Sequence, residues 1–117
     1  MDMNQAREFA EEWVESWNAH DLDKILSHYE GDFEMSSPMI RKHENVHSGK
    51  LKGKADMSSY WARALERSPN LHFTLINVLL GANSVTVIYE GVRGLSAEVF
   101  HFSESGKVEA AYAHYNL

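Results

Sequence analysis

The spacing of apolar residues near the start of the chain predicts two helices. Over residues 6–17, alanine, phenylalanine, valine and tryptophan recur at steps of three and four, while glutamates occupy the other face. This is the pattern of an amphipathic helix with one wide buried stripe. Asp21 is placed to cap a second, short helix over residues 22–29, which we expect to end at Gly31.

The next forty residues predict a strand, a loop and a third helix. Residues 32–37 are typical of a strand that Pro38 closes, because proline cannot donate to a sheet ladder. The segment 41–53 is polar, contains two glycines and shows no period, so we interpret it as a loop. An apolar helical stripe then returns over residues 55–67 and is broken by residues 68–70.

After the third helix the hydrophobic period changes to two, which predicts strands. The four segments are 71–80, 84–90, 95–103 and 107–115. Short turns that contain glycine separate them, so neighbouring strands should be antiparallel. The order predicts an α+β fold in which three N-terminal helices pack on one face of a curved, mainly antiparallel mixed sheet, as a single domain over residues 1–117.

The first of these strands is apolar on both faces. Alternation places Leu71, Phe73, Leu75 and Leu79 on one face and Ile76, Val78 and Leu80 on the other. Three helices can cover only one face of the sheet, and monomers rarely leave a large apolar patch in water. We therefore expect a homodimer that forms through the outer sheet face.

Composition and charge exclude several classes of protein. The 117 residues are 44% hydrophobic and 24% charged, contain no cysteine and carry a net charge of −6, which argues against disorder, disulfides and a basic nucleic-acid-binding face. The acidic N-terminus does not resemble a signal peptide, and no apolar stretch is long enough to span a membrane. We expect a cytoplasmic protein that binds neither nucleic acid nor membrane. Five of the 11 basic residues fall in residues 41–54, which are either a solvated loop or a loop that attracts an anionic ligand to a nearby opening.

Three stretches together resemble a known family. They are WNAHDLDKILSHYEGDFEMSSP (17–38), LKGKADMSSYW (51–61) and FHFSESGKVEAAYAHY (100–115). The chain resembles the SnoaL-like branch of the nuclear transport factor 2-like superfamily. The resemblance implies a cone-shaped α+β barrel whose interior holds a small, mostly apolar ligand and whose outer sheet face forms dimers. The same fold serves ketosteroid isomerases, polyketide cyclases, dehydratases, epoxide hydrolases and proteins without catalysis, so the site must decide the function.

The resemblance places only part of the ketosteroid isomerase machinery on this chain. The family's base corresponds to Ser37, which cannot shuttle a proton as a carboxylate does, and its oxyanion-holding tyrosine corresponds to Trp13. The second oxyanion acid corresponds to Glu98, and Tyr29 matches a tyrosine that supports the pocket, whose partner would be Trp61. Isomerisation by the family mechanism is therefore not expected.

Glu98 is the candidate acid/base group. If Phe100 and Phe102 face the helices, alternation puts Glu98 on the same interior face, where burial would raise its pKa. Two alternatives are that Glu98 lies at the rim and pairs with Arg93 or solvent, and that it only orients a ligand. The residues expected to bind a substrate are Trp13, Tyr29, Phe33, Met35, Ser37, Trp61, Phe100 and Tyr115.

The histidines are less informative. His101 and His114 fall on the outer sheet face by alternation, but a slip of one residue would turn both inward and make them the acid/base candidates. His43 and His47 have metal-compatible spacing only in a helix, and their segment reads as loop, so we expect no metal and no cofactor.

Two functions follow from these residues. The first is a small-molecule-binding pocket protein that acts as a proton-transfer enzyme of isomerase, cyclase or dehydratase type on an apolar, ring-containing substrate. The second is a non-catalytic ligand-binding or dimerisation module with the same fold.

Overall fold

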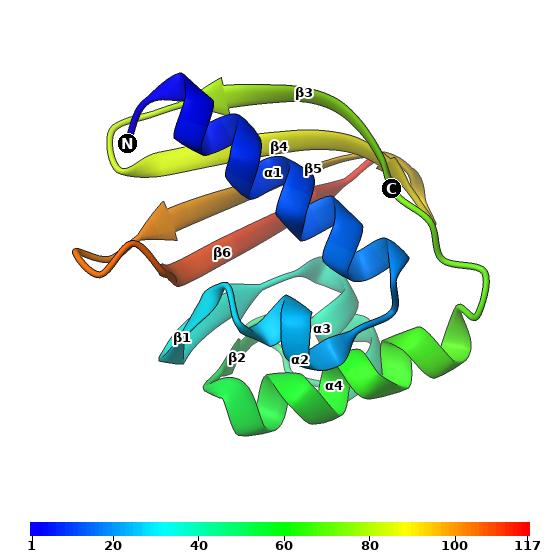
Figure 1. Ribbon diagram of the computed structural model, residues 1–117. Coiled ribbons are helices and arrows are strands. Elements are labelled where there is room, and N and C mark those ends of the chain that lie inside the picture. Colours follow the sequence, from blue (N-terminus) through cyan, green and yellow to red (C-terminus); the bar gives the residue numbers. More distant parts are fainter.

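The computed structural model describes all 117 residues as four helices and six strands. In chain order the elements are α1 (Met3–Asn18), α2 (Leu22–Leu26), β1 (Tyr29–Ser36), α3 (Pro38–Glu44), β2 (Lys50–Lys52), α4 (Lys54–Arg67), β3 (Thr74–Leu80), β4 (Ser84–Gly91), β5 (Gly94–Phe102) and β6 (Val108–Tyr115). Figure 1 shows α1 crossing the concave side of the curved sheet, with α4 on the same side next to β1 and α2. The predicted α+β class is confirmed.

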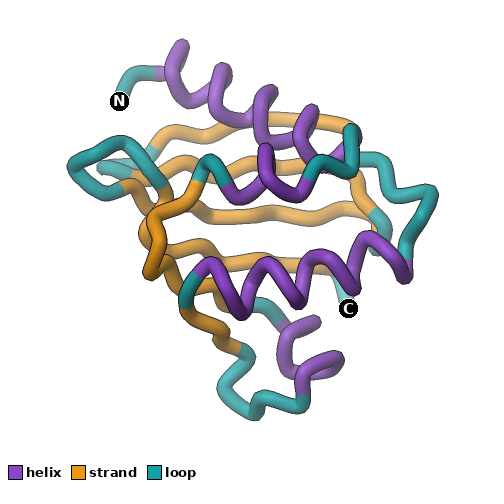
Figure 2. Tube along the Cα trace, turned by 60° about the horizontal axis from the view of Figure 1, so that its bottom comes forward, coloured by secondary structure: helices purple, strands orange, loops and turns teal.

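All six strands form one mixed sheet in the order β2-β1-β6-β5-β4-β3. The β1 and β6 strands run parallel, and every other neighbouring pair runs antiparallel. The four C-terminal strands therefore form the meander that the short turns predict. In Figure 2, α1, α2 and α4 lie on one side of this sheet, whereas α3 projects beyond the end of β2.

The apolar stripe of α1 holds that helix against the sheet. Asp2 caps its N-terminus in a capping box with Gln5, and Ala6, Trp13 and Trp17 are buried on its inner face. At its end, the Asn18 amide donates to the Phe73 carbonyl at 3.0 Å and accepts from the Phe73 N–H at 2.6 Å. These two bonds fix α1 to the chain just before β3.

The prediction of a loop over residues 41–53 is wrong in two places. Residues 38–44 form α3, in which Pro38 occupies the first turn and the Ser37 hydroxyl caps the helix by accepting from the Met39 N–H at 3.1 Å. The helix ends at Asn45 in the left-handed conformation, with φ of 54°. Residues 50–52 then pair with β1 as β2. A seven-residue helix is too short to show a hydrophobic period, so its only signals are its caps.

The boundary between the second helix and the first strand is also different from the prediction. The helix α2 ends at Leu26, and β1 begins at Tyr29, so Gly31 lies inside a strand and stops no helix. Tyr29 is fully buried in this strand and pairs with Val108 of β6. Pairing with a neighbouring strand outweighs the weak helical pattern of residues 22–29.

A β-bulge in β3 overturns the predicted faces of that strand. Its register with β4 shifts between Leu75 and Asn77, so the alternation changes phase. Val78 is consequently buried, whereas Leu79 is 50% exposed and Ile76 is 53% exposed. The strand starts at Thr74 rather than at residue 71.

The register of the remaining strands confirms the predicted inner and outer faces. One row across the sheet joins Leu79, Thr86, Val99 and Tyr112, and it lies on the outer face. The neighbouring residue Glu98 is therefore on the inner face. His101 and His114 are exposed on the outer side, so the one-residue slip that would turn them inward does not occur. No helix of the chain is both long enough and apolar enough to cross a lipid bilayer.

The core under α1 is mainly aromatic and surrounds Trp13. Its ring stacks on Phe73 at 5.5 Å and meets Tyr89 and Phe100 edge-on at 5.3 and 5.2 Å. The Trp13 indole Nε1 donates to the Tyr29 hydroxyl at 3.0 Å. These contacts give the inner end of the cavity described below a rigid wall.

Candidate functional site

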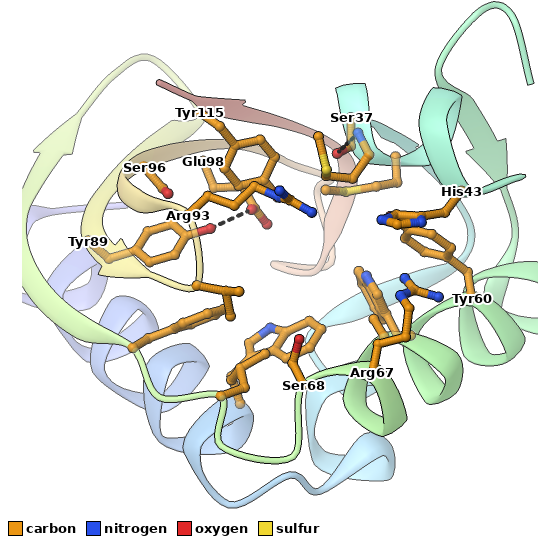
Figure 3. A pocket seen from close by; sticks show the side chains of 18 of the residues that line it. Ser37, His43, Tyr60, Arg67, Ser68, Tyr89, Arg93, Ser96, Glu98 and Tyr115 are labelled. Atoms are coloured by element: carbon orange, nitrogen blue, oxygen red, sulfur yellow. Dashed lines mark hydrogen bonds between the residues drawn. The ribbon is translucent and has the colours of Figure 1, made fainter. Parts of the chain in front are cut away.

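A cavity of about 130 Å³ lies between the sheet and the helices at the end where β4 turns into β5. Twelve of its 19 lining residues are hydrophobic. The lining comes from α1, α3, α4, the end of β1, the last three strands, the segment before β3 and the turn between β4 and β5. The side chains shown in Figure 3 converge on one space from these separate elements. An apolar space with few polar groups is typical of a small-molecule site.

Glu98 is the one acidic side chain that lines this cavity. It belongs to β5, pairs with Val87 and Ala113 on the two flanking strands, and is only 4% exposed. The Tyr89 hydroxyl donates to Glu98 Oε1 at 3.3 Å, and Figure 3 shows this contact as a dashed line. The alternative that placed Glu98 at the rim in a pair with Arg93 is wrong, because Glu98 forms no ion pair.

Burial changes the acidity of this carboxyl. Desolvation raises the pKa of Glu98 from 4.5 to about 8, and the hydrogen bond from Tyr89 partly opposes the rise by stabilising the carboxylate. At neutral pH the carboxyl is therefore mainly protonated, with a substantial ionised fraction. A group in this state can both give and accept a proton.

Three tyrosines share the cavity with Glu98. Burial raises the pKa of Tyr89 and of Tyr115, and the nearby Glu98 charge raises both further. Burial likewise raises the pKa of Tyr60 to about 12. All three phenols therefore keep their protons at neutral pH. Tyr89 donates its hydrogen bond to Glu98, whereas Tyr60 and Tyr115 can donate hydrogen bonds to a ligand.

The structure brings together five of the eight residues predicted to bind a substrate. The residues that line the cavity beside Glu98 are Trp13, Met35, Ser37, Trp61 and Tyr115. Ser37 does so while its hydroxyl caps α3, so that oxygen is already engaged as an acceptor.

Tyr29, Phe33 and Phe100, which were also predicted to bind a substrate, do not line the cavity. Each is fully buried in the core. Phe100 packs against Phe9 at 4.9 Å, toward the start of α1 and away from the opening. Tyr29 accepts the hydrogen bond from Trp13, so it supports a wall of the cavity from behind.

Sequence reasoning did not assign Arg67, Arg93 or His43 to the pocket, although all three line it. Figure 3 shows His43 and Arg67 on the side of Tyr60, with Arg93 reaching in from the other side. A signal for Arg67 was present, because it follows Tyr60 and Ala64 at helical spacing on one face of α4. The five lysine and arginine residues of positions 41–54 do not line the cavity, so the prediction that this loop attracts an anion to the opening gains no support from them.

The chain contains no group of three or more histidine, aspartate or glutamate side chains placed to hold a metal ion. The polar chemistry of the cavity comes from its carboxyl, its phenols, three hydroxyls of serine and the arginines near its opening. These groups can move a proton, hydrogen-bond a carbonyl oxygen and attract negative charge.

Comparisons with known proteins agree with this architecture. A SnoaL-like protein of unknown function from Burkholderia thailandensis is 48% identical, with a TM-score of 0.96 over 99% of this chain and 98% of that one. The epoxide hydrolase/cyclase-like enzyme SalBIII, which has a role in pyran ring formation in the polyether salinomycin, is 15% identical, with a TM-score of 0.78 over 99% of this chain and 94% of that one. TerC, crystallised with polyporic acid, is 16% identical, with a TM-score of 0.74 over 95% and 91% of the two chains.

The two distant structures show a shared fold alone. None of the curated proteins matches the chain. The model of the SnoaL-like domain matches residues 10–113, which include all elements from α2 to β5 and the larger part of α1 and of β6. The chain belongs to the SnoaL-like family.

Proposed function

We propose that this protein binds a small, mostly apolar molecule that contains a ring, and that it transfers a proton on that molecule with Glu98 as the acid/base group. The observation that carries the proposal is a single carboxyl at the buried end of an apolar cavity, with its pKa raised to about 8. A general acid or base works best when its pKa lies near the working pH. A stability role does not explain this residue, because burying an ionisable carboxyl costs free energy.

The reaction needs no covalent intermediate. The ionised carboxylate of Glu98 takes a proton from a carbon next to a carbonyl group, and the resulting acid returns it to a second position or to a leaving hydroxyl. Isomerisation, ring closure and dehydration all fit this scheme, because each moves a proton between two atoms of one substrate. The Tyr89 phenol stabilises the ionised form of Glu98, and the phenol of Tyr115 is available to a substrate oxygen.

The size and walls of the cavity support a ring as the bound group. A volume of about 130 Å³ is close to that of an apolar cavity known to hold benzene, roughly 150 Å³. Trp13, Trp17 and Trp61 all line this space. Two proteins with the same fold support this choice of ligand: SalBIII has a role in pyran ring formation, and TerC was crystallised with polyporic acid.

Hydrogen exchange into candidate substrates tests the proposal directly. Small cyclic ketones are incubated with the protein in D₂O, and proton NMR follows the loss of hydrogen next to the carbonyl. We expect catalysed exchange with the natural chain and none with Glu98→Gln, which keeps the shape of the side chain but cannot accept the proton.

The matched control is Glu109→Gln, an exposed glutamate on β6 outside the cavity, and it should exchange at the rate of the natural chain. Undiminished exchange in Glu98→Gln would refute the role of Glu98. Saturable binding of the ketones without any exchange would instead support a non-catalytic ligand-binding protein.

A second candidate function, a dimerisation module, is favoured by the outer sheet face. Leu79 and Tyr112 belong to one cross-strand row on this face, and Leu95 is 54% exposed on the neighbouring β5. Exposed apolar side chains grouped on a sheet are typical of an interface. Sedimentation equilibrium should give twice the chain mass of 13.3 kDa, and Leu79→Glu should lower it to the mass of one chain. A monomer at all concentrations would exclude this function.

A further inference from the structure

The open end of the cavity carries positive charge from two separate elements, and a histidine from a third element lies beside them. Arg67 lies in the last turn of α4, Arg93 lies in the turn between β4 and β5, and His43 lies in the last turn of α3. All three line the cavity, and both arginines are exposed, whereas Glu98 is buried. The cavity thus has a buried acidic end and a solvent-facing basic end.

Neither of these arginines has a partner in the protein. The ion pairs of the chain involve Lys24, His28, Lys50 and Arg63 as the cations. Arg41 and Arg63 make side-chain hydrogen bonds, to a backbone carbonyl and to a carboxylate respectively. The chain has 17 acidic and 11 basic residues, so two unpaired guanidinium groups at one opening are not explained by a shortage of carboxylates.

The charges around His43 are mainly positive. Burial lowers the pKa of His43, and the charges of Arg67, Lys42 and Arg93 lower it further. Burial and the neighbouring positive charges both disfavour a cation at this position, whereas only the positive charges, which Glu44 opposes in part, favour an anion. Glu98 does not neutralise the opening, because it is mainly protonated at neutral pH.

We propose that the natural ligand carries an anionic oxygen group, of the carboxylate type, which Arg67 and Arg93 hold at the opening while its ring enters the cavity toward Glu98. The inference rests on the proposed function in that it assigns the ligand to the same cavity. A guanidinium group presents a planar fork of donors that matches a carboxylate, and it attracts anions into a cleft with low-dielectric walls. The anionic group would also fix the direction in which the ligand enters, because the reversed orientation would bury its charge at the apolar end of the cavity, away from both arginines.

The size of the cavity adds a separate argument for this arrangement. About 130 Å³ has room for roughly one ring. A substituent on that ring must then project through the opening, which the two arginines line. A neutral substituent would gain less from them than an anionic one.

A pair of matched probes tests the proposal: benzoate, which carries the anionic group, and benzamide, its uncharged analogue of similar shape. Binding is followed at pH 7 by NMR through the indole N–H signals of Trp13, Trp17 and Trp61, which line the cavity. The variant is the double substitution Arg67→Gln with Arg93→Gln. Arg7→Gln is the control, because it removes the same charge from an exposed position outside the cavity.

We expect benzoate to bind about tenfold more tightly than benzamide, as one charge-assisted contact would provide. The double variant should lose this preference and bind benzamide as the natural chain does, which also shows that it is folded. Arg7→Gln should keep the preference, and added salt should weaken benzoate alone.

Equal binding of the two probes to the natural chain, or a preference for benzoate that survives in the double variant, would overturn the inference and leave the proposed function standing. If neither probe shifted the indole signals, the cavity would not accept a ring. That result would contradict the proposed function as well.

Discussion

Replacing Glu98 by glutamine should stabilise the protein at neutral pH, although it removes a side chain that we place at the centre of the function. In the unfolded chain this carboxyl has its ordinary pKa of 4.5, and in the folded protein its pKa is about 8. Because the folded value is the higher one, the contribution of Glu98 to stability is fully present below pH 4.5 and is lost as the pH rises toward 8. In that range the folded protein must keep a proton that the unfolded chain releases.

The size of this effect follows from the two pKa values. Each pH unit above 4.5 lowers the free energy of unfolding by about 1.4 kcal/mol, so the loss between pH 4.5 and pH 7.5 is about 4 kcal/mol. A glutamine at position 98 does not titrate in this range. The stability of Glu98→Gln minus that of the natural chain should therefore increase by about 4 kcal/mol between these two pH values.

Urea unfolding, followed by tryptophan fluorescence at both pH values, measures this difference. Comparing the variant at two pH values cancels the constant effect of exchanging a carboxyl for an amide. Glu109→Gln, an exposed position, should show no such pH-dependent gain. A change of less than about 1 kcal/mol for Glu98→Gln, which is within the usual error of extrapolation, would refute the reasoning that the carboxyl is buried and protonated.

Three further predictions concern the groups that support the site. Tyr89→Phe should raise the pKa of Glu98 above about 8 in an NMR titration, because its hydrogen bond stabilises the carboxylate; an unchanged midpoint would contradict the contact. Tyr29→Phe leaves the Trp13 N–H without its acceptor, so the free energy of unfolding in urea should fall by about 1–3 kcal/mol. A variant as stable as the natural chain would show that this hydrogen bond does not stabilise the fold. Asn18→Ala removes two hydrogen bonds to the backbone before β3 and should lower stability by about 1–3 kcal/mol, with Asn18→Gln giving only partial rescue; no loss on Asn18→Ala would count against this anchor.

The sequence predicted the parts of the fold in which many residues repeat one pattern. The long helices α1 and α4 show several turns of an apolar stripe, and β4 and β5 alternate over seven or more residues. The short helix α3 has no such repeat, and its signal is the pair Ser37 and Pro38 at its start. The β-bulge near Asn77 depends on pairing with β4, which no local pattern reveals.

The same distinction holds for the site. Glu98 could be placed inside because Phe100 and Phe102 fix the face of their strand, and its burial follows from that face. Arg67 shares a face of α4 with Tyr60 and Ala64, but this spacing does not show that the face borders a cavity. Arg93 lies in a turn, where no periodicity indicates which way a side chain points. The two arginines become neighbours of one cavity only through the packing of α4 against the sheet. Phe100 was assigned correctly to the inner face but lies too deep in the core to reach a ligand.

The pKa of the Glu98 carboxyl tests the central claim most directly. Carbon-13 NMR of the protein labelled at glutamate side-chain carboxyls, with Glu98→Gln to assign the signal, follows its titration from pH 4 to pH 10. The account predicts a midpoint near 8, as expected for a carboxyl in a dry cavity that is ready to transfer a proton. A midpoint near 4.5 would mean a solvated carboxylate and would contradict both the buried site and the proton transfer that we assign to it.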